Sequence, residues 1–182
     1  ISVRMFAGWG FDQSALKAEN LAQLGYQQGV PMGGDLTRPD SNQKIELLIR
    51  ATKDPVGANL DRVQVVKGWL DGDGMAQEKV FNVAWSDQRQ LDKQGRLPKV
   101  GDTVNREDAS YENTIGSIEL ATIWQDPEFN PNQRAFYYVR VLQIPTPRHS
   151  LYDGIALQIK TPDEGPAVIQ ERAYTSSVWY TP

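Results

Sequence analysis

The sequence contains no cysteine and one histidine, His149, among its 182 residues. Without cysteine the chain forms no disulfide and no thiolate site for zinc or an iron–sulfur cluster. One histidine is also too few for a catalytic zinc site of the histidine-rich kind. A hydrolytic triad would have to use His149, because histidine is the side chain that most readily changes charge near neutral pH. The residues alone therefore name no reaction. They favour a non-catalytic part of something larger, with no catalytic residue and no metal ligand.

A strong charge of one sign and a long apolar run are absent too. The formal net charge is −4 and the pI is near 5.1, which gives no field to attract nucleic acid. No apolar run is long enough to span a bilayer, and no signal peptide is recognisable. We therefore expect neither a nucleic-acid partner nor a membrane span. The lack of cysteine leaves the compartment open, since many periplasmic proteins lack disulfides. A periplasmic or secreted location is favoured, with a cytoplasmic one as the alternative.

The length and composition suit one soluble domain. Apolar residues make up 40% of the chain and charged residues 23%, both ordinary for a globular protein. The first residues, Ile1–Phe6, have the character of a strand already under way. We therefore expect residues 1–182 to be a single domain cut from a longer protein.

Helix signals are sparse. Residues 12–24 predict the only convincing helix, with Leu16, Leu21 and Leu24 near one face and Gly25 as its stop. Most of the remaining chain predicts short strands.

The clearest unit is a β-hairpin. Residues 62–70 and 78–86 are rich in apolar side chains, and the four residues at 71–74 between them have strong turn chemistry. A polar stretch over residues 87–113 follows, either as a long ordered loop or as a flexible insertion. Further strands are expected over residues 3–7, 45–51, 118–124, 135–144, 155–160, 168–173 and 175–180. About nine strands and one short helix predict a mainly β fold. Its expected form is an antiparallel two-sheet sandwich, immunoglobulin-like, with a long loop.

One stretch supports the immunoglobulin-like expectation. Residues 134–141 resemble the penultimate strand of immunoglobulin-like and fibronectin-like domains, which often carries a tyrosine whose hydroxyl pins a corner of the chain. The Cys…Trp…Cys spacing of antibody domains is absent, so a true antibody-type domain is excluded.

Two short acidic motifs suggest chemistry but are better explained as turns. Asp71 and Asp73 with their glycines suggest a calcium loop, yet Ala76 stands where an EF-hand needs glycine. Asp126 and Glu128 suggest an acid/base pair, but neighbours in one turn rarely have the different environments that such a pair needs.

The stretch over residues 145–153 has the most functional composition. Two prolines are expected to hold it extended, so adjacent His149 and Ser150 point to opposite sides and form no triad. Binding of an anion by Arg148 is more plausible than nucleophilic chemistry. The alternative is an edge loop in which Arg148 and Asp153 pair with each other.

The five tryptophans raise the question of a sugar-binding face. Trp69, Trp85 and Trp124 occupy strand positions consistent with burial, which favours the core for most of the rings. For Trp9, between two glycines, and Trp179, near the end, both the core and an exposed face stay open.

Several longer stretches together resemble one bacterial family. They are Val3–Trp9, Gly29–Leu36, Asp54–Arg62 running into Val66–Trp69, Arg134–Val141, Pro145–Arg148 and Glu171–Tyr180. These stretches resemble the C-terminal part of the uncharacterised family catalogued as domain of unknown function 3604, and the likeness runs essentially end to end.

The resemblance implies a catalytic domain outside this chain. In that family, a polymerase-and-histidinol-phosphatase-type (PHP-like) metal-dependent hydrolase domain precedes this region. It implies that the ligands of a divalent metal lie in that N-terminal domain, so none is carried over to this chain. The family usually has tryptophan after Pro-Thr-Pro-Arg, where this sequence has His149. A position that accepts tryptophan is not a required ligand or base.

Four residues within the resemblance are candidates for contact with the catalytic domain or a ligand. They are Trp9, Asp35, Arg148 and Asp153. The first hypothesis is an accessory C-terminal domain that packs on the hydrolase domain and helps to shape its cleft. An apolar patch near Ile1 and residues 29–36 would favour it.

Two other hypotheses remain open. The second is a module for carbohydrate or another polar ligand, which uses Trp9 or Trp179 and the loop 87–113. An exposed row of coplanar tryptophan rings would favour it. The third is a free-standing hydrolase that uses His149, which is the least favoured.

Overall fold

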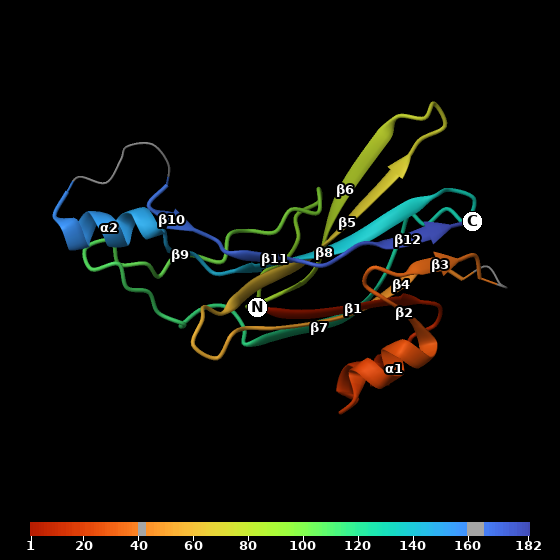
Figure 1. The fold of residues 1–182 in the computed structure, drawn as a ribbon, viewed down its shortest axis with the longest axis horizontal. Coiled ribbons are helices and arrows are strands. Elements are labelled where there is room, and N and C mark those ends of the chain that lie inside the picture. The colour runs from red at the N-terminus through yellow and green to blue at the C-terminus, as the bar shows by residue number, and fades with distance from the viewer. Residues whose placement is uncertain (40–42, 160–165) are drawn as a thin grey trace.

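Two β-sheets pack face to face in the computed structural model, which describes residues 1–39, 43–159 and 166–182 (Figure 1). The first sheet has four antiparallel strands in the order β2-β1-β4-β7. These strands are β1 (Ser2–Gly8), β2 (Gly29–Pro31), β4 (Glu46–Thr52) and β7 (Glu119–Gln125).

The second sheet has six strands, and its main order is β3-β12-β8-β5-β6, with β11 paired to β8. Its strands are β3 (Asp35–Thr37), β5 (Leu60–Leu70), β6 (Ala76–Trp85), β8 (Ala135–Gln143), β11 (Arg172–Tyr174) and β12 (Val178–Thr181). All of its pairs are antiparallel except β3 with β12, which is parallel. A small separate sheet joins β9 (Thr146–Pro147) to β10 (Val168–Ile169).

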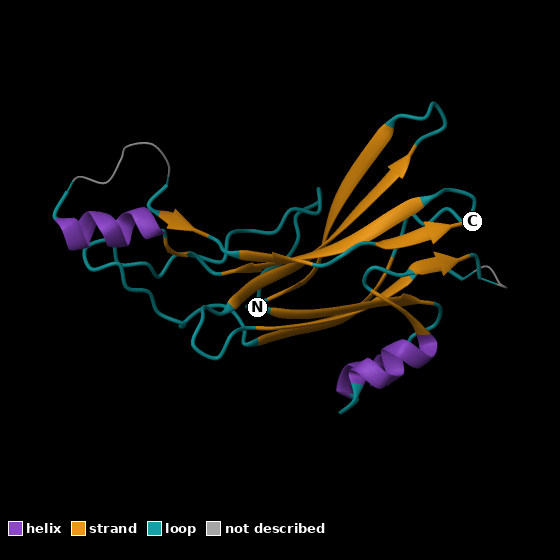
Figure 2. Cartoon of the chain, viewed as in Figure 1, coloured by secondary structure: helices purple, strands orange, loops and turns teal. Residues whose placement is uncertain are grey.

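The core lies between the two large sheets because side chains along a strand point alternately to its two faces, and the apolar ones face inward. In β8, Tyr137, Val139 and Val141 are buried while the residues between them face outward. They meet Leu47 and Ile49 of β4 in one hydrophobic cluster. The predicted mainly β sandwich is therefore confirmed (Figure 2). The likeness to immunoglobulin domains stays a prediction.

The helix expected over residues 12–24 is wrong in its bounds. A 3₁₀ helix, η1 (Gln13–Lys17), comes first and is capped by Asp12. The α-helix α1 (Leu21–Gln28) begins after Asn20, whose side chain accepts a hydrogen bond from the Gln23 N–H. Gly25 lies inside α1 and does not end it. A side chain there would come within 2.4 Å of the Phe6 ring, so the glycine lets α1 approach β1 closely. The two helices η1 and α1 thus pack on the outer face of the four-stranded sheet.

A second helix, α2 (His149–Leu157), replaces the strand expected over residues 155–160. Lys160 lies outside the described residues. The prediction of extended chain holds only as far as Arg148, whose backbone has ψ 152 and starts the helix. Leu151 and Gly154 then face the interior, where Leu151 packs against Val104 and Ala109. The described residues thus contain two α-helices, where one was expected.

The remaining strands agree closely with their predicted places. The hairpin of β5 and β6 is continuous, with Leu70 opposite Ala76. The strand predicted over 168–173 is divided into β10 and β11, and the last strand begins at Val178. Within the described part of the chain, no helix has the length and apolar character needed to cross a membrane.

Candidate functional site

The four residues singled out from the sequence lie in three separate places. Trp9 is half-buried between the sheets, where its ring lies 5.7 Å from Phe129 and 6.0 Å from Tyr180. Asp35 is exposed on β3, opposite Trp179 of β12. The other two are on α2, at the opposite end of the molecule from β3 (Figure 1). No single site combines the four.

Arg148 and Asp153 do not form the ion pair that was the alternative for this stretch. Arg148 is half-buried at the start of α2, where its backbone N–H donates to the Ala167 carbonyl at 2.9 Å. Asp153 is exposed five residues later, on a different side of the helix. The edge-loop interpretation is therefore wrong, because the chain forms a helix here. His149 is also exposed, at the first position of α2.

The two acidic motifs are turns, as predicted. Asp71 accepts hydrogen bonds from the backbone N–H groups of Asp73 and Met75 and from the side chain of Gln77, at 3.0, 2.9 and 2.7 Å. The Met75 bond is the main cause that lowers the pKa of this carboxyl. Asp126 accepts from the Glu128 N–H at 2.9 Å, which closes the second turn.

Asp126 also takes part in a buried polar cluster that the sequence did not signal. Its Oδ2 accepts from Lys67 Nζ at 2.6 Å and from the Tyr137 hydroxyl at 2.7 Å, and all three residues are nearly inaccessible. Lys67 Nζ also donates to the Glu128 carbonyl at 2.8 Å. Tyr137 thus ties β8 to the chain after β7, the kind of role expected of a tyrosine in this strand. The cluster is internal, which suits a structural role.

Alkaline pH should weaken the fold through Tyr137. Burial raises the pKa of its hydroxyl well above the ordinary value, and the negative charge of Asp126 adds to the effect. In the unfolded chain tyrosine loses its proton near pH 10. The folded state therefore binds more protons above about pH 10, and the free energy of unfolding falls there by up to about 1.4 kcal/mol per pH unit.

Urea unfolding between pH 8 and 11 checks this prediction. Tyr137→Phe should remove part of the decline, even though the substitution lowers stability at every pH by the loss of one hydrogen bond. Exposed Tyr26 provides the control, and Tyr26→Phe should keep the full decline. Equal slopes for the Tyr137 variant and the unaltered chain would contradict the prediction.

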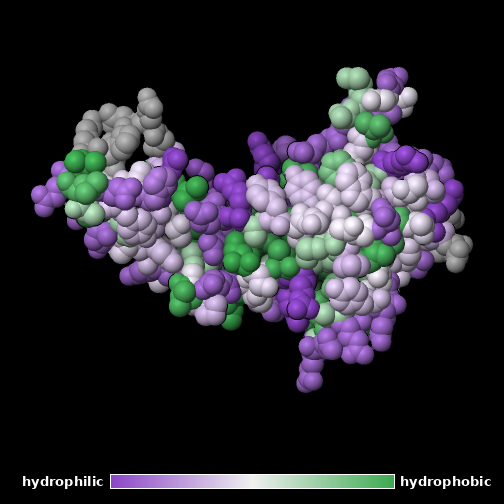
Figure 3. Space-filling view, in the orientation of Figure 1, coloured by the Kyte–Doolittle hydropathy of each residue, from purple (hydrophilic) through white to green (hydrophobic). Residues whose placement is uncertain are grey.

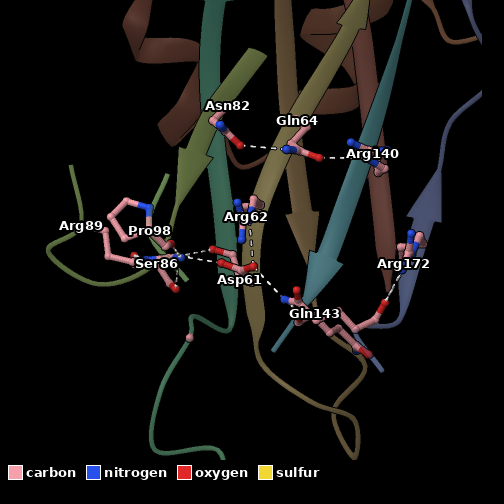
Figure 4. A network of polar contacts seen from close by, with 12 residues as sticks. Asp61, Arg62, Gln64, Asn82, Ser86, Arg89, Pro98, Arg140, Gln143 and Arg172 are labelled. Carbon is pink, nitrogen blue, oxygen red and sulfur yellow. Dashed lines mark hydrogen bonds and ion pairs between the residues drawn. The ribbon is translucent and has the colours of Figure 1, made fainter. Parts of the chain in front are cut away.

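A second buried carboxylate, Asp61, holds the start of the 87–113 segment (Figure 4). Its Oδ2 accepts from Arg62 Nε at 2.9 Å and from Gln170 Nε2 at 2.8 Å, and its Oδ1 lies 2.8 Å from a terminal nitrogen of Arg89. Arg89 also donates to the carbonyls of Asp61 and Pro98, at 2.8 and 3.0 Å. Asp61 and Arg89 thus fasten this segment to β5.

The outer face of the six-stranded sheet continues from this anchor as a polar row. Gln64 donates to Asn82 at 2.9 Å and accepts from Arg140 at 2.8 Å, which links β6, β5 and β8 (Figure 4). Farther along the same face, the polar residues give way to aromatic ones. This change divides the face into a polar half and an aromatic half.

The aromatic half bears a row of four rings that the topology brings together from three strands. Phe136 lies 5.2 Å from Trp179 and 6.4 Å from Tyr138, and Tyr138 lies 6.3 Å from Tyr174, measured between ring centroids. Tyr174 and Trp179 are 53% and 51% exposed. The Phe136 ring lies over Gly68, where a side chain would come within 2.2 Å of it. Gly68 therefore makes room for this row.

A groove of about 600 Å³ opens at the Trp179 end of the row. Phe136 and Trp179 line it together with Leu70 and Ala76 of the β5–β6 hairpin. Three charged side chains also line it: Asp35, Glu78 and Arg134. This aromatic groove, defined by these seven residues, is the best candidate for a ligand site because it combines an apolar floor with a few polar groups.

The sequence contained part of the signal for this groove. Phe136 and Tyr138 flank a buried residue in one strand, so alternation alone places both on the outer face. Their meeting with Trp179 depends on the pairing of β12 with β8, which a single sequence does not specify. The row differs from the row of coplanar tryptophans that would have favoured the carbohydrate hypothesis: one tryptophan, one phenylalanine and two tyrosines form it. Only Phe136 and Tyr138 are near parallel, at 9°.

Across residues 1–39, 43–159 and 166–182, no group of three or more histidine, aspartate and glutamate side chains could hold a metal ion. The divalent metal implied by the resemblance therefore does not fit the described residues of this chain.

Comparison with known proteins gives one match. A family model described as protein of unknown function (DUF3604) matches residues 1–182. No curated protein matches the chain, and no solved structure does. The family model spans the chain from first residue to last, and the chain belongs to this family of unknown function.

Proposed function

We propose that the chain is an accessory C-terminal domain of a metal-dependent hydrolase of the PHP-like kind. In this role it is non-catalytic by itself, packs on the N-terminal catalytic domain and helps to shape that domain's cleft. Membership of the family supports the proposal of a separate catalytic domain, because the resemblance described above implies one. The observation that carries the docking role is an exposed apolar surface on α2.

Four exposed apolar side chains on α2 and just after its end are called here the α2 apolar surface: Tyr152, Ile155, Leu157 and Ile159, which are 47%, 39%, 66% and 56% exposed. Figure 3 shows a small hydrophobic patch at this end of the molecule, besides others near its centre. Large apolar side chains grouped on a surface are typical of an interface. Arg148 and Asp153 on the same helix supply polar groups beside it.

The location of this surface differs from the one expected. Ile1, Val30 and Met32 are partly buried and pack against the core, so they do not form the open apolar patch that would have favoured docking there. The docking role is therefore assigned to α2.

No reaction step is assigned to this chain. In the proposed protein the divalent metal and its ligands belong to the catalytic domain, and they would supply the hydrolytic chemistry there. The part of this chain that the structure describes contributes a surface and holds no cluster suited to that metal.

Charged substitutions on the α2 apolar surface test the docking. In a longer family protein that contains this domain, Leu157→Asp with Ile159→Asp should loosen the two domains. Burial of one such side chain contributes about 1.5–3 kcal/mol, so cleavage between the domains by a protease should rise about tenfold or more.

The control is Val56→Asp, which alters another highly exposed apolar side chain, in the loop between β4 and β5. In the isolated chain, the melting temperature of each variant should stay within about 2–4 °C of that of the unaltered domain, because the replaced side chains are exposed. Equal protease resistance of the α2 variant and the Val56 variant in the longer protein would refute docking through α2.

A further inference from the structure

We infer that the aromatic groove binds a neutral carbohydrate. This site is separate from the docking role proposed for α2, because the groove lies at the β3 and β12 end of the molecule and α2 at the other. The inference therefore stands or falls independently of that role.

The floor of the groove offers what the face of a sugar ring needs. The face of an aromatic ring is electron-rich, and a pyranose presents C–H groups of opposite polarity on its flat side. Phe136 and Trp179 stand side by side at 5.2 Å, and the row continues through Tyr138 to Tyr174. Successive rings at such spacing can each support part of a short oligosaccharide, so the row predicts a chain of linked sugars.

The surrounding structure keeps this floor open and in place. The Phe136 ring can occupy this place over β5 because Gly68 has no side chain. Val178 and Tyr180 on either side of Trp179 are buried in the core, which fixes the strand that carries the exposed ring. The groove volume of about 600 Å³ falls within the range of ordinary small-molecule sites.

The rim specifies a neutral, hydroxyl-rich ligand. Asp35 and Glu78 supply hydrogen-bond acceptors and Arg134 supplies donors, which together match hydroxyl groups that both donate and accept. All three side chains are exposed, and none has a hydrogen bond or ion pair with another described residue. Two negative groups against one positive group disfavour an anionic ligand such as a phosphate or a uronic acid.

The same rim argues against an apolar protein segment as the occupant. Such a segment would cover Asp35, Glu78 and Arg134 without offering them partners. Burial of unpaired charges is costly, so an apolar segment would bind poorly. Sugar hydroxyls would satisfy these groups while the ring faces cover the aromatic floor.

The test begins with the labelled chain on an array of neutral and uronic-acid-containing glycans, followed by calorimetric titration with the best neutral tetrasaccharide. We expect binding to at least one neutral glycan. Trp179→Ala should weaken it about tenfold or more, which corresponds to about 1.4 kcal/mol. The double variant Asp35→Asn with Arg134→Gln should also weaken it, and it guards against misfolding because both side chains are exposed. Circular dichroism establishes that each variant is folded.

The matched control is Tyr26→Ala, since Tyr26 is an aromatic residue 65% exposed on α1, away from the groove. Its affinity for the glycan should be unchanged. Binding of uronic-acid glycans alone, or no binding to any glycan on the array, would overturn the inference. So would a neutral glycan whose affinity is the same for the unaltered chain and both groove variants.

Discussion

Lys67→Met is expected to destabilise the domain by about 3–5 kcal/mol, the usual effect of removing one partner from a buried ion pair. Methionine keeps the length of the side chain but leaves the Asp126 carboxylate without its cation. Asp126 is fully buried, so water cannot replace the lost partner. The Tyr137 hydroxyl and the Glu128 N–H remain as hydrogen-bond donors and supply only part of what the ammonium gave. Urea unfolding at pH 7 measures the difference.

The chain offers a matched control on the neighbouring strand. Lys79 lies directly opposite Lys67 in the β5–β6 register and pairs with Glu128 in the same turn. This second pair is largely exposed, and exposed pairs contribute about 0–1 kcal/mol. Lys79→Met should therefore have little effect. Equal losses of stability in the two lysine variants would contradict the prediction that the buried pair stabilises the fold more than the exposed pair.

Asp61→Asn is expected to cost about 2–3 kcal/mol and to release the start of the 87–113 segment. The substitution keeps the shape of the side chain but removes the charge that two largely buried arginines share, Arg62 and Arg89. Because Arg89 also bonds the carbonyl of Pro98, its displacement should free the chain between them. Amide hydrogen exchange should become faster in residues 87–98, with a smaller change in β1 and β4.

Asp92→Asn is the control for this second variant. Asp92 lies in the same segment and pairs with Arg96, but both side chains are well exposed. Its stability and exchange should stay close to those of the unaltered chain. Unchanged amide exchange of residues 87–98 in the Asp61→Asn variant would contradict the prediction. It would show that Arg89 stays in place without the Asp61 carboxylate.

The two sheets could be predicted because alternation is a local signal. The inward-facing residues of β4 are apolar, as are those of β8 apart from Gln143 at its end, and the turn chemistry between β5 and β6 is strong. The start of α2 could not be predicted in this way. Two prolines favoured extended chain, and the helix is stabilised by Leu151 against Val104 and Ala109, residues more than 40 positions earlier. Tertiary contacts outweighed the local preference.

The buried carboxylates show a second limit. Asp126 precedes proline in a motif that predicts a turn, and the turn is present, but nothing local reveals that Lys67 reaches it from β5. Asp61 likewise gains its partners from Arg89 and Gln170, which are distant in the chain. The charge of these residues does not indicate burial, because burial depends on which strands lie side by side.

The candidate site depends on the same long-range information. Asp35 and Trp179 meet through the parallel pairing of β3 with β12, the one departure from an antiparallel arrangement in the large sheets. Both were noted in the sequence, but for unrelated reasons. Trp9 belongs with the core rings Phe129 and Tyr180, as the core interpretation of most tryptophans would place it.

The most direct measurement of the central claim is hydrolysis of phosphate monoesters and diesters with added Mg²⁺, Mn²⁺ or Zn²⁺. Residues 1–182 should be assayed beside a longer family protein that contains the N-terminal domain. The accessory role predicts metal-dependent activity in the longer protein and none in residues 1–182 alone. Metal-dependent turnover by residues 1–182 at a rate comparable with the longer protein would contradict it.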